Sequence, residues 1–404
     1  MIVQHYKLNY PRKISIILLL ICSFHNFAQS VQAYKEEAFL NNSKLQALKK
    51  QQEILEAEQK QETAWSPTKI RSGYFVGNPD ISDGTIQGVL GVSQTIPILG
   101  YQKSLKKIAE IQTKIAANTF EIQKKKFFLE LEQLYYQLYE YRATLKIQED
   151  QLTMIKKYIS KINTDSLGSY ESTLILRQIE ENELQNTIEI LKGSLLNAEN
   201  RFNQMLGRDG FDPLEIPDNF FMPDEEPTLL LDDITFHPEL EMHEYHYELN
   251  ESKLKLNTKD KFSSLTLGLD YFFINENNAV SSSSDQDFAM PNASVSIPFF
   301  SKKNRIQKKV LLVTIDKEEY NKINTKGNLE SLLETAVTNR ITARISYTSY
   351  QKAISLLQSL KLKLNDVDKS EIYKISNQIY TYKIKTIVAI ANYFQQTAIF
   401  NYLQ

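Results

Sequence analysis

The sequence predicts a mainly α-helical protein with a small β part, built from two copies of one structural unit. Three observations support this prediction. Long stretches carry apolar residues at alternating spacings of three and four, which is the period of a coiled coil. Four short stretches alternate apolar and polar residues, which is the period of a strand. The same order of stretches recurs 201 residues later, which indicates an internal repeat.

Composition excludes some classes of protein. The chain has 404 residues, of which 42% are apolar and 24% charged, and its formal net charge is -2. Nucleic-acid binders carry a basic excess, and disordered chains have fewer apolar residues. We therefore expect an ordered protein without a nucleic-acid partner.

The first 28 residues are typical of a secretory signal peptide. Arg12 and Lys13 precede an apolar run over residues 14–24, and Ala28 follows at a position suited to cleavage. The only cysteine, Cys22, lies inside this segment. Cleavage before Cys22 would instead make a lipoprotein, but bulky Ile21 disfavours that alternative. No later apolar stretch approaches the ~20 residues that a transmembrane helix needs.

Two long helices are predicted in the first half. Residues 101–162 contain neither Pro nor Gly, and an apolar seam runs from Phe127 to Ile162. At 1.5 Å per residue this helix would be on the order of 90 Å long. A second seam covers residues 174–205, with Arg177 and Glu181 as polar members, and Gly207 follows as a C-terminal cap.

The four alternating stretches predict two β-hairpins. Residues 264–272 form the clearest strand, because every second side chain is apolar: Leu265, Leu267, Leu269 and Tyr271. The other strands are predicted at 69–77, 85–96 and 292–297. Strands of about 10 residues suit a tilted crossing of a bilayer, with the apolar side chains facing lipid. A hairpin half-buried against soluble helices is the alternative.

The internal repeat divides the mature chain. Pro97 and Pro298 occupy matching positions, and each is followed 72 residues later by a serine, Ser169 or Ser370. We predict a first repeat at 29–207, a Pro-rich acidic connector at 208–235 and a second repeat at 236–404. Each repeat would run helix, hairpin, long helix, tip and returning helix, so the two tips should lie at equal height.

These passages resemble the TolC-like outer-membrane efflux ducts. The resemblance covers essentially the whole mature chain and is carried by "LGVSQTIPILGYQKSLKK" (90–107), "ASVSIPFFSKKNRIQKK" (293–309), "HPEL" (237–240) and "LLNAENRFNQMLG" (195–207). The passage "TAWSPTKIRSGY" (63–74) looks more like the cation-efflux branch. The glycine-rich turn of the family is reduced to Gly100 in the first copy and replaced by "SKKN" in the second. Lys369 stands where the first tip has Gly168.

The resemblance implies a trimer whose helices form an α-barrel and whose strands, four per chain, share one transmembrane β-barrel. Four strands with free edges cannot stand alone in lipid, which independently requires more than one chain. The implied partners are outer-membrane lipid, a periplasmic adaptor and an inner-membrane pump of the RND type. Substrates would be metal cations or small molecules, passing through a duct that is itself passive.

Particular residues receive roles within this picture. Pro97 and Pro298 would mark the membrane rim, because proline has no N–H to continue the ladder, with ordinary strand termination as the alternative. The tips would dock the adaptor through Leu167, Gly168, Ser169, Lys369 and Ser370. Asp165, Asp366 and Asp368 would form acidic rings that draw cations and close the inner mouth. Plain solvated turns are the alternative for these aspartates.

No enzyme site is predicted, because the sequence assembles no nucleophile–base pair and no phosphate-binding loop. No cofactor is expected. The stretch "HPELEMHEYH" offers His237, His243 and His246 as metal ligands, but a solvated helix start is the simpler interpretation. The alternative to a duct is a secreted periplasmic coiled-coil scaffold without a pore, and an enzyme comes third.

Overall fold

The computed structural model describes residues 30–76, 80–81, 84–97, 100–161, 169–224, 231–259, 264–275, 287–295, 302–364 and 369–404. The predicted signal peptide lies outside these residues. Two compact units are present: one combines residues 1–46, 124–231 and 330–404, and the other combines 47–123 and 232–329. Each unit draws on both predicted repeats, and the repeat boundaries stay predictions.

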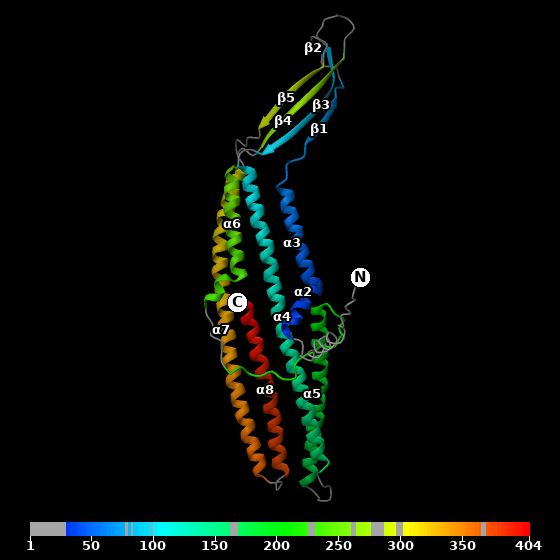
Figure 1. The fold of residues 1–404 in the computed structure, drawn as a ribbon, viewed down its shortest axis with the longest axis vertical. Coiled ribbons are helices and arrows are strands. Elements are labelled where there is room, and N and C mark those ends of the chain that lie inside the picture. The colour runs from blue at the N-terminus through cyan, green and yellow to red at the C-terminus, as the bar shows by residue number, and fades with distance from the viewer. Residues whose placement is uncertain are drawn as a thin grey trace, which may run out of the picture. The chain divides into compact units, whose positions relative to one another are not determined.

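The chain is mainly helical, as predicted, with one antiparallel sheet (Figure 1). The first half contains α2 (Val31–Asn41), α3 (Ser43–Glu62), β1 (Lys69–Tyr74), β2 (Asp80–Ile81), β3 (Gly84–Pro97), α4 (Tyr101–Ile159) and α5 (Ser169–Leu206). A short 3-10 helix, η2 (Leu231–Phe236), leads into the second half. There follow α6 (Pro238–Lys259), β4 (Ser264–Asn275), β5 (Phe288–Val295), α7 (Lys302–Lys363) and α8 (Lys369–Leu403).

The sheet has the strand order β1-β3-β4-β5, and β2 extends the β3 hairpin. The two halves of the chain meet at β3 and β4, where Val92 pairs with Leu269 and Thr95 with Thr266. Strand β5 begins at Phe288, four residues before the predicted start at Asn292. The sequence did not predict this part of the strand because it contains Pro291, and proline disfavours a strand. Proline is tolerated here because β5 is an edge strand.

The predicted start of α4 after Gly100 and the predicted end of α5 before Gly207 are confirmed, whereas α4 ends at Ile159, three residues before the predicted Ile162. Gly100 and Gly207 adopt φ values of +79° and +75°, a region that suits glycine. A Cβ at residue 207 would lie 2.6 Å from the carbonyl oxygen of Asn41, so no larger side chain fits. The seam of α4 is buried as predicted, with Leu131, Leu138 and Ile155 fully enclosed.

The connector after α5 is held tightly against the first unit. Its Phe220 ring lies 4.7 Å from the ring of Tyr139 and 5.2 Å from that of Phe394, centroid to centroid. Both contacts are tilted or edge-on, the geometry that aromatic pairs prefer. The connector thus joins α4 to α8 through a shared aromatic cluster, rather than acting as a loose linker.

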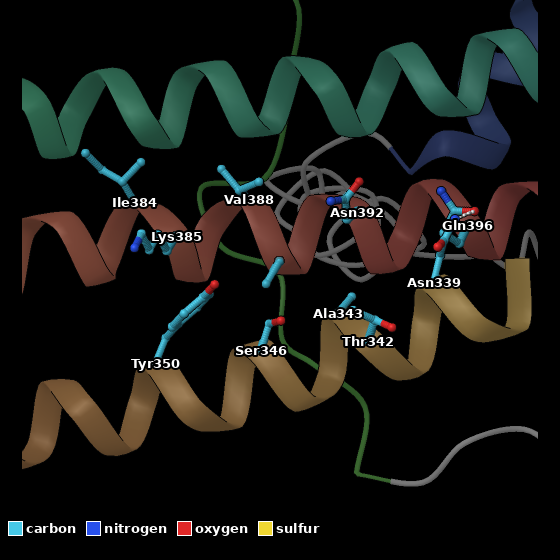
Figure 2. Close-up of a pocket in the computed structure, with 11 residues that line it drawn as sticks. Asn339, Thr342, Ala343, Ser346, Tyr350, Ile384, Lys385, Val388, Asn392 and Gln396 are labelled. Atoms are coloured by element: carbon cyan, nitrogen blue, oxygen red, sulfur yellow. Dashed lines mark hydrogen bonds between the residues drawn. The ribbon is translucent and has the colours of Figure 1, made fainter. Parts of the chain in front are cut away.

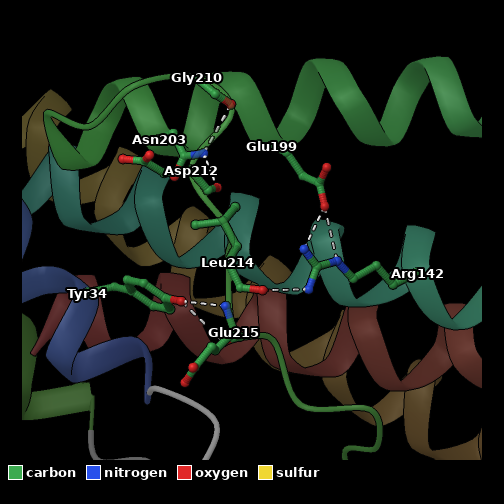
Figure 3. A network of polar contacts seen from close by, with 8 residues as sticks. All are labelled: Tyr34, Arg142, Glu199, Asn203, Gly210, Asp212, Leu214 and Glu215. Atoms are coloured by element: carbon green, nitrogen blue, oxygen red, sulfur yellow. Dashed lines mark hydrogen bonds and ion pairs between the residues drawn. The ribbon is translucent and has the colours of Figure 1, made fainter.

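Polar contacts also hold this connector in place (Figure 3). Arg142 on α4 donates to Glu199 Oε1 at 2.6 Å and to the carbonyl oxygen of Leu214 at 2.9 Å. The hydroxyl of Tyr34 accepts a hydrogen bond from the Glu215 N–H at 2.9 Å. Asn203 donates to two connector carbonyls, those of Gly210 and Asp212. Backbone N–H and C=O groups of the connector, which follows α5, are thereby hydrogen-bonded by side chains.

Candidate functional site: a two-faced sheet and the helix tips

One face of the sheet is apolar and open to its surroundings. On β4, the side chains of Leu267, Leu269 and Tyr271 are 44%, 46% and 40% exposed, and Leu265 is half-buried. Register places further apolar side chains beside them on the neighbouring strands, among them Ile70, Leu90, Val92, Ala293 and Val295. An apolar patch spread over four strands is far larger than scattered surface residues and marks contact with lipid or another protein.

The opposite face carries a polar cluster at Asp270, while Val89, Phe272, Phe288 and Met290 on the same face are apolar. Asp270 on β4 is only 2% exposed, and it accepts hydrogen bonds from Arg71 Nε at 3.1 Å and from Asn292 Nδ2 at 2.7 Å. Gly91 lies between Arg71 and Asp270 in the register, where a Cβ would meet the Asp270 carboxylate at 2.2 Å. The glycine therefore makes room for a charged bridge across three strands.

Both edges of the sheet are open within the described residues, where β1 pairs only with β3 and β5 only with β4. An open edge presents unpaired N–H and C=O groups, which in lipid cost several kcal/mol each. Pro97 ends β3 opposite Ser264, at the end of the ladder where it was predicted. The matching Pro298 lies outside the described residues.

The tips are described only in part. Ser169 begins α5, and Lys369 and Ser370 begin α8 with exposed side chains. The other predicted tip and gate residues lie outside the described part of the chain: Asp165, Leu167, Gly168, Asp366 and Asp368. Their proposed roles stay predictions.

A polar cluster near the tips joins three helices, and we name it the latch: Gln151, Arg177, Glu180, Tyr373 and Asn377. Gln151 on α4 donates to Asn377 on α8 at 2.5 Å, and Asn377 donates to Glu180 on α5 at 2.7 Å. Arg177 donates to Glu180 at 2.5 Å and lies over the Tyr373 ring at 4.5 Å. Burial, the largest contribution, raises the pKa of Tyr373, and the Glu180 carboxylate raises it further.

Sequence analysis did not identify the latch as a site. One signal was present, because Arg177 and Glu181 interrupt an otherwise apolar seam, and a charge in a seam position needs a partner. The partners on α4 and α8 lie far away in sequence, and no local pattern shows that they face Arg177 and Glu180.

The histidines of the α6 start do not form a metal site with their neighbours. His243 lies between Glu318 Oε2 at 3.0 Å and Thr325 Oγ1 at 2.9 Å, both on α7. His237 is buried and accepts a hydrogen bond from the Glu239 N–H at 3.3 Å, before the helix begins. Within the described residues, no group of three or more His, Cys, Asp or Glu side chains could hold a metal ion.

An open groove of about 370 Å³ lies between α7 and α8 (Figure 2). Amide and hydroxyl side chains line much of it, including Asn339, Ser346, Asn392 and Gln396. Asn339 and Gln396 meet across it at 3.4 Å, and Lys385 lies on the rim beside the ring of Tyr350. Apolar side chains, among them Ala343, Val388 and Ala389, share the groove with these polar groups.

Among the residues that the structure describes, no helix is both long and apolar enough to span a bilayer.

The sequence itself matches no protein-family model and no curated protein. Solved structures are similar, however. CusC, described for folding and transmembrane channel formation, aligns over 95% of this chain and 94% of its own, with a TM-score of 0.76 and 14% identity. The chain has the fold of outer-membrane channels.

Two further channels show the same fold. The outer membrane protein VceC of Vibrio cholerae has a TM-score of 0.72 at 9% identity, covering 92% of this chain and 95% of its own. The Neisseria gonorrhoeae MtrE outer membrane channel has a TM-score of 0.74 at 12% identity, covering 93% and 88%. The outer-membrane channel fold expected from the TolC-like resemblance is therefore confirmed.

Proposed function

We propose that this protein is the outer-membrane duct of a tripartite efflux system. Its sheet would cross the outer membrane, and its helices would extend into the periplasm to meet an adaptor and an inner-membrane pump, of the RND type by analogy. The duct would be passive, and the pump would select the substrate, either metal cations or small molecules. No catalytic step is assigned to the chain.

The observation that carries the proposal is the two-faced sheet with two open edges. Its apolar face has the composition that lipid requires, and the charged and polar cluster of Asp270, Arg71 and Asn292 on the opposite face suits a water-filled lumen. The open edges need partner strands, and a second and third copy supply them in a closed barrel. A homotrimer of four-strand contributions gives about twelve strands, within the range of such barrels.

The alternative is a periplasmic scaffold in which the sheet is a soluble cap. Cell fractionation separates the two proposals. The duct should be recovered with the outer membrane, resist extraction by urea, and migrate on a gel as an oligomer that collapses to a monomer only after boiling. Release of the protein by osmotic shock, as a species that heating does not change, would support the scaffold.

The gate has its own test. Replacing both Asp366 and Asp368 with Ala removes two negative charges per chain from the predicted inner mouth, where close like charges act strongly on passing ions. Single-channel conductance in a planar bilayer should rise or lose its cation preference. Parental conductance with unchanged ion selectivity would make these aspartates ordinary turn residues.

A further inference from the structure

A dense basic surface lies at the start of the two helices that follow strands β3 and β5 in the chain. We name it the basic collar and define it by six exposed side chains on α4 and α7: Lys103, Lys106, Lys302, Lys303, Arg305 and Lys308. The first acidic residue on α4 is Glu110, and on α7 it is Asp316. The collar stretches of α4 and α7 therefore carry only positive charges, in a chain whose formal net charge is -2, while Glu56 on α3 lines the same groove as Lys106.

The two parts of the collar lie close together, because the end of α6 contacts both. Lys259 on α6 donates to Ser104 Oγ on α4 at 3.0 Å, and Asn257 donates to the carbonyl oxygen of Asn304 on α7 at 3.0 Å. Lys103 and Lys106 follow the strand end at Pro97 by six and nine residues. At 1.5 Å per helical residue, they lie within about 10 Å of the first turn of α4.

Helix stability does not account for these charges. The N-terminus of a helix carries a partial positive charge, so basic residues in the first turn are unfavourable and acidic ones favourable. Three other helices follow this rule, with Glu171 at the start of α5, Glu239 at α6 and Glu371 at α8, whereas α2 and α3 have no acid in the first turn. The first turns of α4 and α7, which follow the strands, contain no acid.

Internal ion pairs do not account for them either. The residue after Lys106, Lys107, pairs with Glu248 at 2.6 Å, and farther along α7 Lys322 pairs with Glu244 at 2.8 Å. Within the described residues, by contrast, none of the six collar side chains has an acidic partner. These basic residues are unfavourable at a helix start and have no acidic partner within the described residues. This indicates that they interact with a partner outside the chain.

We infer that the basic collar binds the anionic phosphate head groups of the bilayer leaflet that faces the helices. This inference depends on the proposed function, since it requires the apolar face to lie in lipid. Head groups begin where the hydrocarbon ends, and long basic side chains reach back to them from a helix that starts just outside. Electrostatic attraction to anionic lipid decays within a Debye length of about 8–10 Å, so only charges near the strand ends take part.

The test compares two variants that each remove two charges from α7. Lys303→Gln/Lys308→Gln alters the collar, and the matched control Lys317→Gln/Lys326→Gln alters exposed lysines two or more turns farther along. Full-length protein in neutral detergent is mixed with equal amounts of phosphatidylglycerol and phosphatidylcholine with identical acyl chains. Native mass spectrometry then counts the lipids of each kind that the oligomer retains.

The parent should retain phosphatidylglycerol in preference, because each basic side chain near an anionic surface contributes about fivefold. The collar variant should lose roughly tenfold or more of this preference, and the control should stay within about twofold of the parent.

A heat-modifiable oligomer without lipid preference, or equal losses in both variants, would overturn the inference without contradicting the proposed duct function. If excess inorganic phosphate abolishes the preference and chloride of equal ionic strength does not, the site binds free phosphate instead. Failure to form the heat-modifiable oligomer would contradict the proposed function itself.

Discussion

Leu267 and Thr266 are neighbours in the chain, but they lie on opposite faces of the sheet. Leu267 is exposed among apolar side chains, whereas the Thr266 hydroxyl lies 3.0 Å from that of Thr95 on the polar face. A period-two pattern in nine letters of sequence was enough to predict this difference. The pattern did not indicate the buried charge on the polar face, because Asp270 alternates like any polar residue and its partner Arg71 is 199 residues away.

The first prediction uses this pair of positions. Leu267→Arg should lower the stability of the assembled barrel by up to about 2–4 kcal/mol, because it would place a charge on the face proposed to contact lipid, where the cost is greatest at the bilayer midplane. Thr266→Arg alters the face that would line the lumen of the proposed duct, and it should be mild. The fraction of heat-modifiable oligomer, measured during urea titration in lipid vesicles, reports both. Equal losses at the two positions, or none at either, would contradict the assigned faces.

At the scale of elements, the periods of three, four and two predicted most of the helices and strands. The start of α4 and the end of α5 agreed because glycines next to helix ends are local signals, whereas α4 ends at Ile159, three residues early, where no such signal stands. Strand β5 was predicted too short, because Pro291 masks an edge strand. Contacts between helices, such as the latch, were not predicted, because they depend on the three-dimensional orientation of the packed helices, which no local sequence pattern gives.

The second prediction concerns the latch. Asn377→Ala removes hydrogen bonds to Gln151 and Glu180, which should weaken the contact of α8 with α4 and α5 by about 1–3 kcal/mol. If the tips close the duct, single-channel conductance or opening frequency should increase. Asn339→Ala is a suitable control, since that side chain makes one long contact at 3.4 Å. Parental conductance in the Asn377 variant would restrict the latch to a purely structural role.

The third prediction concerns pH and the packing of α6. Burial lowers the pKa of His246 below 6.5, and His243 and Lys253 lower it further, while Glu318 acts in the opposite direction. The unfolded chain therefore binds a proton more readily than the folded one, and stability falls as pH drops below about 6.5. Urea unfolding at about pH 7.5 and about pH 5.5 should show this loss, and His246→Leu should reduce it. A pH dependence identical in parent and variant would assign the effect to other groups.

At the scale of the whole molecule, the open edges of β1 and β5 require the protein to assemble with other chains. Within the described residues neither edge is covered, although the sheet carries an apolar face suited to lipid. In water such edges lead to aggregation, and in lipid they are prohibitive, so other chains must pair with them. Sequence repetition predicted four strands, and physical chemistry predicted more than one copy. Only the resemblance supplied the number three.

The last prediction tests this closure directly. The predicted mature chain contains no cysteine, so introduced cysteines would be the only ones. Ser72 on β1 and Ala289 or Ala293 on β5 lie on the apolar face, whereas Ser294 on β5 lies on the polar face. Suppose that β5 of one copy pairs with β1 of the next. Ser72→Cys should then form a disulfide between chains with either Ala289→Cys or Ala293→Cys, whichever residue the register places opposite residue 72. Ser72→Cys with Ser294→Cys should not, because the side chains point to opposite faces.

On a non-reducing gel after boiling, oxidised protein should show bands of one, two and three chains and none larger, since a closed ring has no free edge. A ladder continuing beyond three chains would indicate open-ended pairing, and cross-linking by the opposite-face pair would refute the edge-to-edge arrangement.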